Sequence, residues 1–576
     1  MAARLQSLAP PDTVVLSETT ARLVQGYFTW QPLGSHALAD GAPPLAVYQV
    51  LETSGAHGRL DVAPPHALTP LVGRKQEVQL LMERWARVQE GMGQVVLMSG
   101  EAGIGKSRLV QVFKAHLVDT PHTRWEYYGS SYHQHTAFYP LIDLWERTLH
   151  AQHAESPAAK LARLEDALAR YSLPLDETVP LLSALLSLPL PSERYAPLTL
   201  TPQRQRQQTL ETLLALTLER ATRHPVVLII EDLHWVDPST LEFLNLLIDQ
   251  GPTARILALL TFRPDFRPPW VGRTHLTQIT LSRLTRRQAA EMTDRVVHRK
   301  ALPPEVREQV VARTDGVPLF VEELTKMVLE SGLLQEREDR YELTGPLPPL
   351  AIPATLHDSL MARLDRLATV KGLVQLGATL GREFTYALLQ AVAPWDETTV
   401  RQGLQQLVAA EFVYQQGLPP QATYVFKHAL IQEAAYQSLL KSTRQQYHQR
   451  IAQVLEAPFA ETMETQPEVL AYHYTEAGLS EYALPYWQRA GARATARSAY
   501  VEAIGHLTAG LAVLEALPET PERTLHELHL QVALGTALTA PRGFAAAEAG
   551  QAYSRARELA RQVPDTPQLA PVLLGL

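Results

Sequence analysis

Short apolar runs alternate with helical patterns through the first half of the chain. Three of these runs have the length of a buried strand: Gln94–Met98, Val226–Ile230 and Arg255–Thr261. Between Glu77 and Val88 the apolar residues recur at helical spacing instead, and other helical stretches flank the strands. This alternation predicts a parallel β-sheet with helices on both faces.

Helical periodicity dominates after Leu281 and continues to the end of the chain. The proline-rich stretch Gly345–Pro353 and a short β-like stretch, Phe412–Phe426, interrupt it. From Glu468 onward, small and aromatic residues occupy the packing positions of paired helices, as in tetratricopeptide repeats, whose period is about 34 residues. An irregular helical bundle would bury the same residues, so both arrangements stay open here. The residues are Leu470, Tyr474, Ala477, Gly478, Ala483, Tyr486, Trp487, Ala490, Ala503, Leu507 and Leu511.

The first part of the chain has a different pattern. Thr13–Leu16 and Ala46–Leu51 alternate apolar and polar positions, which indicates a few strands with a short helix. Glycines and prolines then gather between Ser54 and Pro70, so we expect a linker there.

Composition narrows the functional classes. A chain of 576 residues is expected to hold three or four domains, and the absence of cysteine excludes disulfides, thiolate metal sites and cysteine nucleophiles. A net charge of −8 gives no general attraction to nucleic acid, so nucleic-acid partners are not expected. No apolar run reaches the length of a membrane span and Met1–Pro11 lacks a signal-peptide core, so we expect no membrane association and a cytoplasmic location.

One glycine-rich segment matches the Walker A pattern in full. It follows a predicted strand and opens a predicted helix, as a phosphate-binding loop must. The glycines let successive backbone N–H groups face a phosphate, Lys106 would reach the β- and γ-phosphates, and Ser107 would ligate Mg²⁺. The loop therefore predicts binding of ATP or ADP with Mg²⁺ through Gly100, Glu101, Ala102, Gly103, Ile104, Gly105, Lys106 and Ser107.

A Walker B strand supplies the acids that such a site requires. Val226–Ile230 is followed by Glu231 and Asp232, which we expect to serve the metal and to activate water. The common order would place aspartate first, so the division of roles between the two stays open. Arg263 follows the next strand, where it could sense the γ-phosphate or lie on the surface. The histidines show no His-Glu-x-x-His spacing, and we expect Tyr132–His135 to form a loop near the nucleotide and not a metal clamp.

Four motifs together resemble a known family. They are Leu71–Arg74 with Glu77, the Gly100–Ser107 loop, Glu231–Thr240 and Gly316–Phe320. In this combination they are similar to the predicted ATPases fused to bacterial class III nucleotide cyclases, and to the wider STAND class of signalling ATPases.

The resemblance implies roles for further residues. Val72, Gly73 and Arg74 would lie against the adenine side, Pro318 would pack on the base, and Arg263 would be a sensor arginine. His428, in Phe426-Lys427-His428, would lie where such proteins use a histidine to contact the ADP phosphate, whereas a histidine taken alone is more often an ordinary, partly buried one.

The resemblance also implies a domain order. It comprises a cyclase remnant (1–54), a linker (55–70), a P-loop core (71–270), a helical lid (271–352), a winged helix (353–456) and tetratricopeptide-like repeats (457–576).

The first 54 residues resemble the C-terminal end of a class III cyclase domain. Ala2–Gln6 matches the segment that holds the transition-state arginine, which would be Arg4, and Leu33–Tyr48 matches the final strands. The metal-binding aspartates of that family are absent, so we expect a truncated domain or a late start codon and no cyclase activity. We also expect that the helical array once continued beyond Leu576.

Taken together, these features predict a slow, signalling ATPase that binds ATP and Mg²⁺ and presents helical repeats to protein partners. A nucleotide-dependent oligomer would suit such a switch. Two alternatives stay open: part of an adenylate or guanylate cyclase, and a STAND-type transcriptional regulator.

Overall fold

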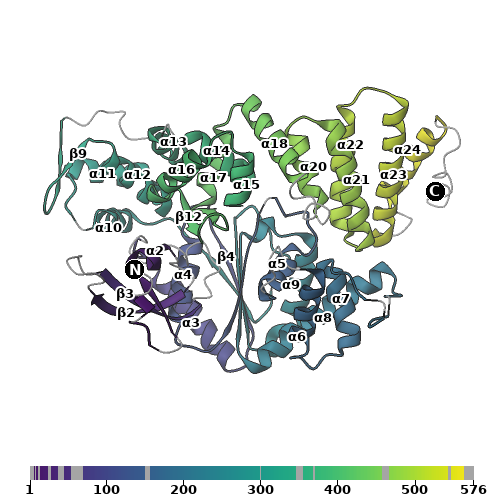
Figure 1. The fold of residues 1–576 in the computed structure, drawn as a ribbon, viewed down its shortest axis with the longest axis horizontal. Coiled ribbons are helices and arrows are strands. Elements are labelled where there is room, and N and C mark those ends of the chain that lie inside the picture. The colour runs from purple at the N-terminus through teal and green to yellow at the C-terminus, as the bar shows by residue number, and fades with distance from the viewer. Residues whose placement is uncertain are drawn as a thin grey trace. The chain divides into compact units, whose positions relative to one another are not determined.

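The computed structural model describes residues 5–6, 8–10, 13–23, 28–36, 45–53, 69–130, 132–149, 156–191, 193–196, 198–270, 272–298, 300–345, 355–367, 370–456, 466–542 and 546–562. These residues form two compact units. Unit 1 comprises residues 1–80, 100–118 and 280–441, and unit 2 comprises 81–99, 119–279 and 442–576. Figure 1 labels the elements. Among the described residues, no helix has the length and hydrophobicity needed to cross a bilayer.

The beginning of unit 1 is a small antiparallel sheet. Strands β1 (Val14–Ser17), β3 (Leu45–Thr53) and β2 (Phe28–His36) lie in the order β1-β3-β2, and helix α2 (Glu18–Leu23) follows β1. The predicted strands are therefore present. Arg4 and most of the predicted linker lie outside the described residues, so the cyclase resemblance stays a prediction.

Unit 2 contains the main sheet, whose strand order is β5-β6-β7-β4-β8. The strands are β4 (Gln94–Ser99), β5 (Thr123–Tyr128), β6 (Val226–Glu231), β7 (Ile256–Phe262) and β8 (Leu276–Thr280). The pairs β5–β6, β6–β7 and β4–β7 are parallel. All residues of β4, β6 and β7 are buried, because helices cover a parallel sheet on both faces.

Helices with apolar stripes pack on this sheet. Residues of α5 (Tyr139–Thr148), α6 (Pro157–Leu168), α7 (Leu175–Leu186), α8 (Pro202–Arg223) and α9 (Pro238–Gln250) share one hydrophobic cluster with β4, β6 and β7. Helix α3 (Lys75–Gln89) buries Leu81, Trp85 and Val88, which confirms the helix predicted from spacing. The predicted P-loop α/β architecture is thereby confirmed.

The lid consists of three helices and a hairpin in unit 1. They are α10 (Arg286–Val296), α11 (Pro304–Arg313), α12 (Pro318–Glu330), β9 (Leu334–Glu336) and β10 (Tyr341–Leu343), and the two strands are antiparallel. Helix α4 (Lys106–His116) belongs to the same unit.

The region after the lid has the secondary-structure elements of a winged helix, which are several helices and a small antiparallel sheet. Its helices are α13 (Leu356–Arg366), α14 (Lys371–Leu380), α15 (Tyr386–Val392), α16 (Glu397–Ala409) and α17 (Ala429–Gln437). Strands β11 (Glu383–Thr385), β12 (Val413–Gln416) and β13 (Thr423–Phe426) form an antiparallel sheet in the order β11-β13-β12. The β-like stretch predicted near residues 412–426 is the β12–β13 hairpin.

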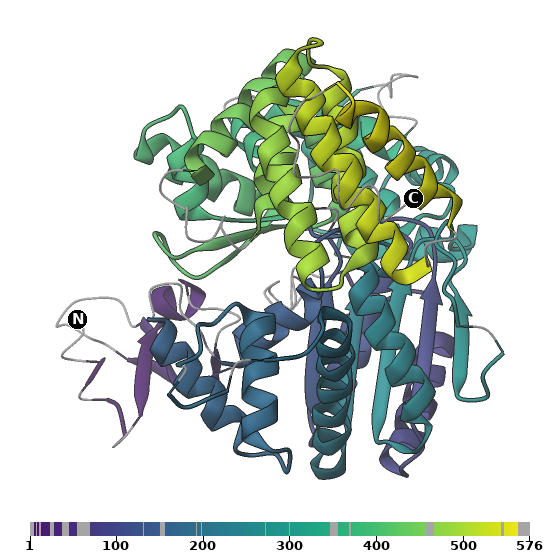
Figure 2. The same ribbon diagram turned by 90° about the vertical axis from the view of Figure 1, so that its right-hand side faces the viewer.

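The C-terminal part of unit 2 is entirely helical where it is described. Helices α18 (Lys441–Glu456), α20 (Pro467–Glu476), α21 (Ser480–Ala496), α22 (Tyr500–Glu515), α23 (Pro521–Arg542) and α24 (Ala547–Ala560) follow one another. Consecutive helices from α20 to α24 pack side by side, as Figure 2 shows.

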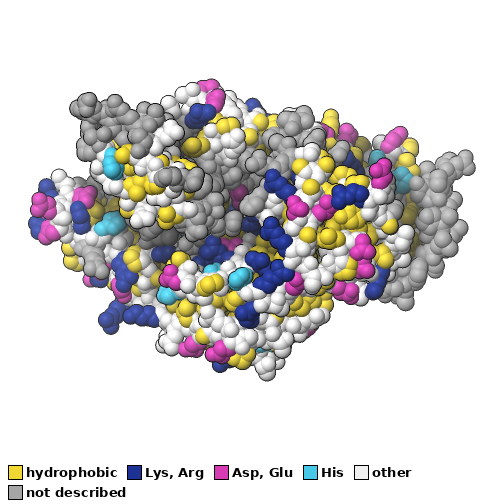
Figure 3. All heavy atoms as spheres, turned by 60° about the horizontal axis from the view of Figure 1, so that its bottom comes forward, with side chains coloured by type: hydrophobic (Ala, Val, Ile, Leu, Met, Phe, Trp, Pro, Cys, Tyr) yellow, Lys and Arg dark blue, Asp and Glu magenta, His cyan; other side chains and the backbone are white. Residues whose placement is uncertain are grey.

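On the surface, Figure 3 shows basic, acidic and apolar side chains interspersed over the face that it draws.

Candidate functional site

The Walker A loop runs from the end of β4 to the start of α4. Gly103 and Gly105 have φ angles of 78° and 101°, in the left-handed region that favours glycine. Gly105 is the N-cap of α4, and its position provides no side-chain cap for the first turn of the helix. A helix start without a side-chain cap, preceded by a glycine-rich turn, suits an anion.

Lys106 lies within this loop and is 8% exposed. Its Nζ donates to the carbonyl oxygens of Gly100 at 2.7 Å and of Glu101 at 3.0 Å. The ammonium is therefore held against the concave side of its own loop, within reach of a phosphate that the loop would enclose.

The 72–74 segment is attached to the loop and to the lid. Arg74 is 6% exposed and donates to the carbonyls of Ile104, at 3.5 Å, and of Ser282, while also pairing with Glu77. Val72 is buried in a cluster that includes Leu284 and Met292 of the lid region. The structure thus brings the predicted adenine-side segment to the Walker A loop.

The lid touches the loop through the start of α12. The Leu319 amide donates to the Gly103 carbonyl at 3.1 Å, and a Cβ on Gly103 would lie 3.0 Å from Leu319 Cβ. Pro318 occupies the first turn of α12 beside this contact. The predicted lid residue therefore lies next to the loop.

A second lid contact was not predicted. Arg283 forms a bidentate ion pair with Glu101, at 2.9 to 3.1 Å, and also pairs with Asp315. Glu101 occupies a variable position of the Walker A pattern, so the pattern itself carries no signal for this pair.

The Walker B acids lie at the carboxyl end of β6, in unit 2. Glu231 ends the strand and is 4% exposed, and the Gly129 amide donates to its carbonyl at 2.7 Å. Asp232 has a φ of 58°, and its amide donates to Thr261 Oγ1 at 3.2 Å. Strands β4 and β6 flank β7 in one parallel sheet, so the strand that leads into the Walker A loop and the strand that ends in the acids finish at the same sheet edge.

Arg263 directly follows β7 at that edge. Its guanidinium carbon lies 5.0 Å from the centre of the Trp235 ring, in the segment after the Walker B acids. A cation over an indole face is a favourable contact. This contact fixes Arg263 beside the Walker B segment, and its role toward a γ-phosphate stays a prediction.

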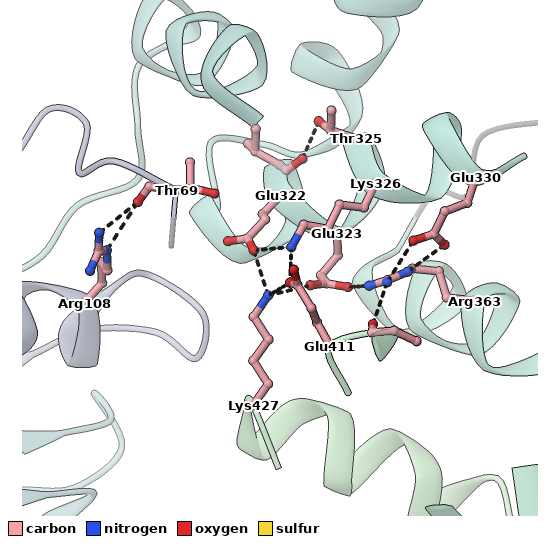
Figure 4. A network of polar contacts seen from close by, with 12 residues as sticks. Thr69, Arg108, Glu322, Glu323, Thr325, Lys326, Glu330, Arg363, Glu411 and Lys427 are labelled. Atoms are coloured by element: carbon pink, nitrogen blue, oxygen red, sulfur yellow. Dashed lines mark hydrogen bonds and ion pairs between the residues drawn. The ribbon is translucent and has the colours of Figure 1, made fainter. Parts of the chain in front are cut away.

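His428 lies at the N-cap of α17, and its carbonyl accepts from the Ile431 amide at 3.0 Å. The preceding residue, Lys427, is 3% exposed and lies in a set of buried charges that the sequence did not indicate. We call this set the ion cluster; Figure 4 shows its members, which are Glu322, Glu323, Lys326, Arg363, Glu411 and Lys427.

The ion cluster joins α12 of the lid to the winged helix. Lys427 Nζ lies 2.9 Å from Glu322 and 2.8 Å from Glu411, and Lys326 contacts the same two carboxylates. Burial alone would raise the pKa of Glu322, but Lys427 and Lys326 outweigh it and lower that pKa. Burial likewise opposes the charge of Lys427, while Glu322 and Glu323 hold its pKa well above the usual value.

Arg363, on α13, completes the ion cluster. It pairs with Glu323 and with Glu330, the latter at 3.0 Å, and donates to the Ala410 carbonyl at 3.0 Å. Spacing could have given one signal for the cluster, because Glu322 and Lys326 are four residues apart on a helix. Their partners come from distant parts of the chain, which spacing does not identify.

Arg108 directly follows Ser107 and interacts electrostatically with Glu322. It donates to the Thr69 carbonyl at 3.1 Å, as Figure 4 shows. Burial lowers the pKa of Arg108, and Glu322 partly offsets this effect. The helix that carries the Walker A lysine is therefore electrostatically linked to the ion cluster.

Residues 70–260 match the family model described as an AAA ATPase domain. The chain contains an AAA ATPase domain. The match covers the loop, the Walker B acids and most of the main sheet, and it ends before Arg263, the lid and the winged helix.

The matches with three similar proteins cover more of the chain than the family model does. An uncharacterized protein of Rhizobium meliloti is 28% identical over 99% of this chain, which spans about half (54%) of that protein's length. A STAND protein with a tetratricopeptide repeat sensor from Pyrococcus horikoshii has a structure that covers 88% of this chain and 67% of its own, with 13% identity and a TM-score of 0.43. The Aeropyrum pernix Orc1 protein, solved in complex with DNA, covers 66% of this chain and 97% of its own, with 13% identity and a TM-score of 0.31.

Proposed function

We propose that this chain is an ATP-dependent switch, in which the AAA ATPase domain binds ATP with Mg²⁺ and hydrolyses it slowly. The observation that carries the proposal is the Walker A loop with its buried Lys106, at the end of a parallel strand whose sheet also carries Glu231 and Asp232. The matched AAA ATPase domain supports it.

The residues have distinct roles in this proposal. The backbone of Gly103–Ser107 surrounds the phosphates, Lys106 neutralises their charge, and Ser107 holds Mg²⁺. Glu231 or Asp232 accepts the proton of the attacking water, and the other acid serves the metal. Magnesium bound together with phosphates needs only one or two protein ligands, so a preformed cage of acids is not required.

The lid and the winged helix would report the state of the nucleotide. Val72, Gly73, Arg74 and Pro318 would hold the base, and Arg263 would sense the γ-phosphate. His428 would contact the ADP phosphate and tie the winged helix to the bound nucleotide. The helices after residue 466 would then present a surface to protein partners, in a manner that depends on the nucleotide.

The direct test is calorimetric titration with ATP and Mg²⁺. Replacing Lys106→Ala removes a charge-assisted contact to phosphate, so we expect ATP to bind about ten- to a hundredfold more weakly. The control is Lys441→Ala, at an exposed lysine that begins α18. ATP affinity that is equal in the parent and Lys106→Ala would refute the proposed site.

Turnover separates the two acids. We expect Asp232→Asn and Glu231→Gln both to reduce hydrolysis, and the acid that activates water to be the one whose substitution leaves ATP·Mg²⁺ binding intact. The other substitution should weaken the dependence of binding on Mg²⁺.

A further inference from the structure

The segment that follows the Walker B acids is held by a buried carboxylate of its own. After Asp232 the chain makes one turn of 3-10 helix, Leu233–Trp235, and enters α9 at Asp237. Asp237 is fully buried, and its Oδ1 accepts from the amides of Thr240, at 2.9 Å, and Phe138, at 2.8 Å. Only four residues therefore separate this fixed point from Asp232 itself.

A second residue at the start of α9, Ser239, donates its hydrogen bonds to a residue far away in the sequence. The Ser239 amide donates to Glu502 Oε1 at 2.9 Å, and the Ser239 hydroxyl donates to the same oxygen. Glu502 belongs to α22 and is 1% exposed. Its Oε2 is buried and has no hydrogen-bond partner among the described residues. The start of α9 is thus capped from two sides, once locally and once by the C-terminal helices.

Other contacts fix α22 in this position. Ala503 and Leu507 share a hydrophobic cluster with Leu228 and Ile230 of β6, the strand that ends in the Walker B acids. On α20, Glu468 accepts from Thr136 Oγ1 at 2.6 Å. The C-terminal helices are therefore part of the same packed body as the Walker B strand.

The Glu502 carboxylate is buried at this contact, and burying a charge costs free energy unless hydrogen bonds or opposite charges compensate for it. Here the amide at the helix N-terminus and the Ser239 hydroxyl stabilise it. Replacing Glu502 by an apolar residue would leave two donors of Ser239 without their acceptor. The contact therefore makes the geometry of α9 depend on where α22 lies.

We propose that Glu502 is a positioning residue for the Walker B segment, through which the C-terminal helices set the rate of ATP hydrolysis. The proposal rests on the proposed ATPase function. A partner that displaces α22 would remove the cap from Ser239 and loosen the turn that leads back to Asp232. Glu502 touches neither nucleotide nor metal in this role, so it acts on turnover and not on ATP affinity.

The test compares four single variants of the full chain, and a double-mutant cycle follows. Glu502→Ala removes the cap, and Glu502→Gln keeps an oxygen that can accept from Ser239. Glu515→Ala changes an exposed acid of the same helix, and Leu507→Ala weakens the same packing without touching the cap. Hydrolysis at saturating ATP, ATP affinity and amide hydrogen exchange of residues 239–241 are measured for each.

We expect Glu502→Ala to lower turnover by roughly tenfold, the equivalent of one charge-assisted hydrogen bond, with ATP affinity unchanged. Amide hydrogen exchange at residues 239–241 should become faster. Glu502→Gln should restore most of the turnover, and Glu515→Ala should match the parent. A double-mutant cycle with Ser239→Ala should be non-additive, since both substitutions break one contact.

Two outcomes would overturn the proposal. One is parental turnover in Glu502→Ala; the other is an equal loss in Leu507→Ala, which would assign the effect to general packing. If the parent itself does not hydrolyse ATP, the proposed function fails, and amide hydrogen exchange at residues 239–241 alone decides whether Glu502 holds the segment.

Discussion

Two groups of buried charges in this protein are stabilised in opposite ways. In the ion cluster, Lys427 is 3% exposed and lies among carboxylates, so that positive and negative side chains neutralise one another. At the start of α9, Asp237 and Glu502 are both acids, and they are stabilised by backbone amides and hydroxyl groups.

The difference shows in the pKa values. Glu322 and Glu411 of the ion cluster keep their charge at neutral pH, because the lysines lower the pKa values of both carboxylates despite burial. Burial, reinforced by the nearby Glu502, raises the pKa of Asp237 to about 7. Paired charges thus withstand a change of pH and fail when one partner is lost, whereas charges held by dipoles respond to pH itself.

The largest difference in stability between the two regions should appear at low pH. Unit 2 also buries His448, His473 and His506, and burial, with Arg444 and His135 as smaller causes, lowers the pKa values of His448 and His506 to about 4. Burial and then His448 lower the pKa of His473 well below its ordinary value. A histidine with a lowered pKa binds its proton only after unfolding, so stability falls as the pH drops from about 6.5 to 4.

Asp237 acts in the opposite sense in that window, but the histidines outnumber it. We expect the C-terminal helices of unit 2 to lose roughly 5 kcal/mol of stability between pH 6.5 and 4.5, while the ion cluster stays intact. Segment-resolved hydrogen exchange, corrected for intrinsic rates, measures this. Equal loss of protection in α18–α22 and in α12–α17 would contradict the contrast, and His506→Gln should reduce the effect where His298→Gln does not.

Removing one cation from the ion cluster should lower the free energy of unfolding by about 3 to 5 kcal/mol. In Lys427→Met, Glu322 and Glu411 keep only Lys326 as a shared partner, and breaking a buried pair costs that much. Lys326→Met should cost less, because Lys326 is 19% exposed and water can replace its contacts. Urea unfolding measures both, with Lys441→Met as the exposed control. Equal costs for the three variants would show that the buried pairing has no special weight.

The smallest effect should come from Asp237→Asn. The folded-state pKa of Asp237 is raised, so its contribution is present below pH 4 and is lost as the pH rises toward 7. Asparagine also caps helices and does not titrate. Relative to the parent, the variant should gain at most about 1.4 kcal/mol per pH unit between pH 5 and 7. A difference that does not vary with pH would mean that Asp237 stays ionised when buried.

Local patterns in the sequence predicted the loop and the strands β4, β6 and β7 of the main sheet, but not its strands β5 and β8. The three apolar runs became β4, β6 and β7, with ends shifted by at most one residue, and Gly103 and Gly105 of the Walker A loop have positive φ angles. Short strands such as β9 and β11 went unpredicted, because three residues give no measurable alternation.

The contacts that join distant segments were beyond sequence reasoning. Lys427 and Glu322 are 105 residues apart, and Glu502 and Ser239 are 263 apart. No spacing rule connects such pairs, and a buried charge resembles an exposed one in sequence. The Asp-Pro-Ser-Thr pattern at residues 237–240 does predict a capped helix start, so one half of the α9 contact could have been found. The nucleotide roles of Arg263, Pro318 and His428 stay predictions.

The hydrogen bonds of Lys106 have a consequence for how the protein is made. Two carbonyl groups of the loop accept hydrogen bonds from its ammonium, so the loop itself holds Lys106 in place. A phosphate would add to those contacts or replace one of them, and the net gain is a difference between two sets of good contacts. We therefore expect the chain to fold and persist in cells whose ATP supply is low, and nucleotide to act as a signal and not as a structural component.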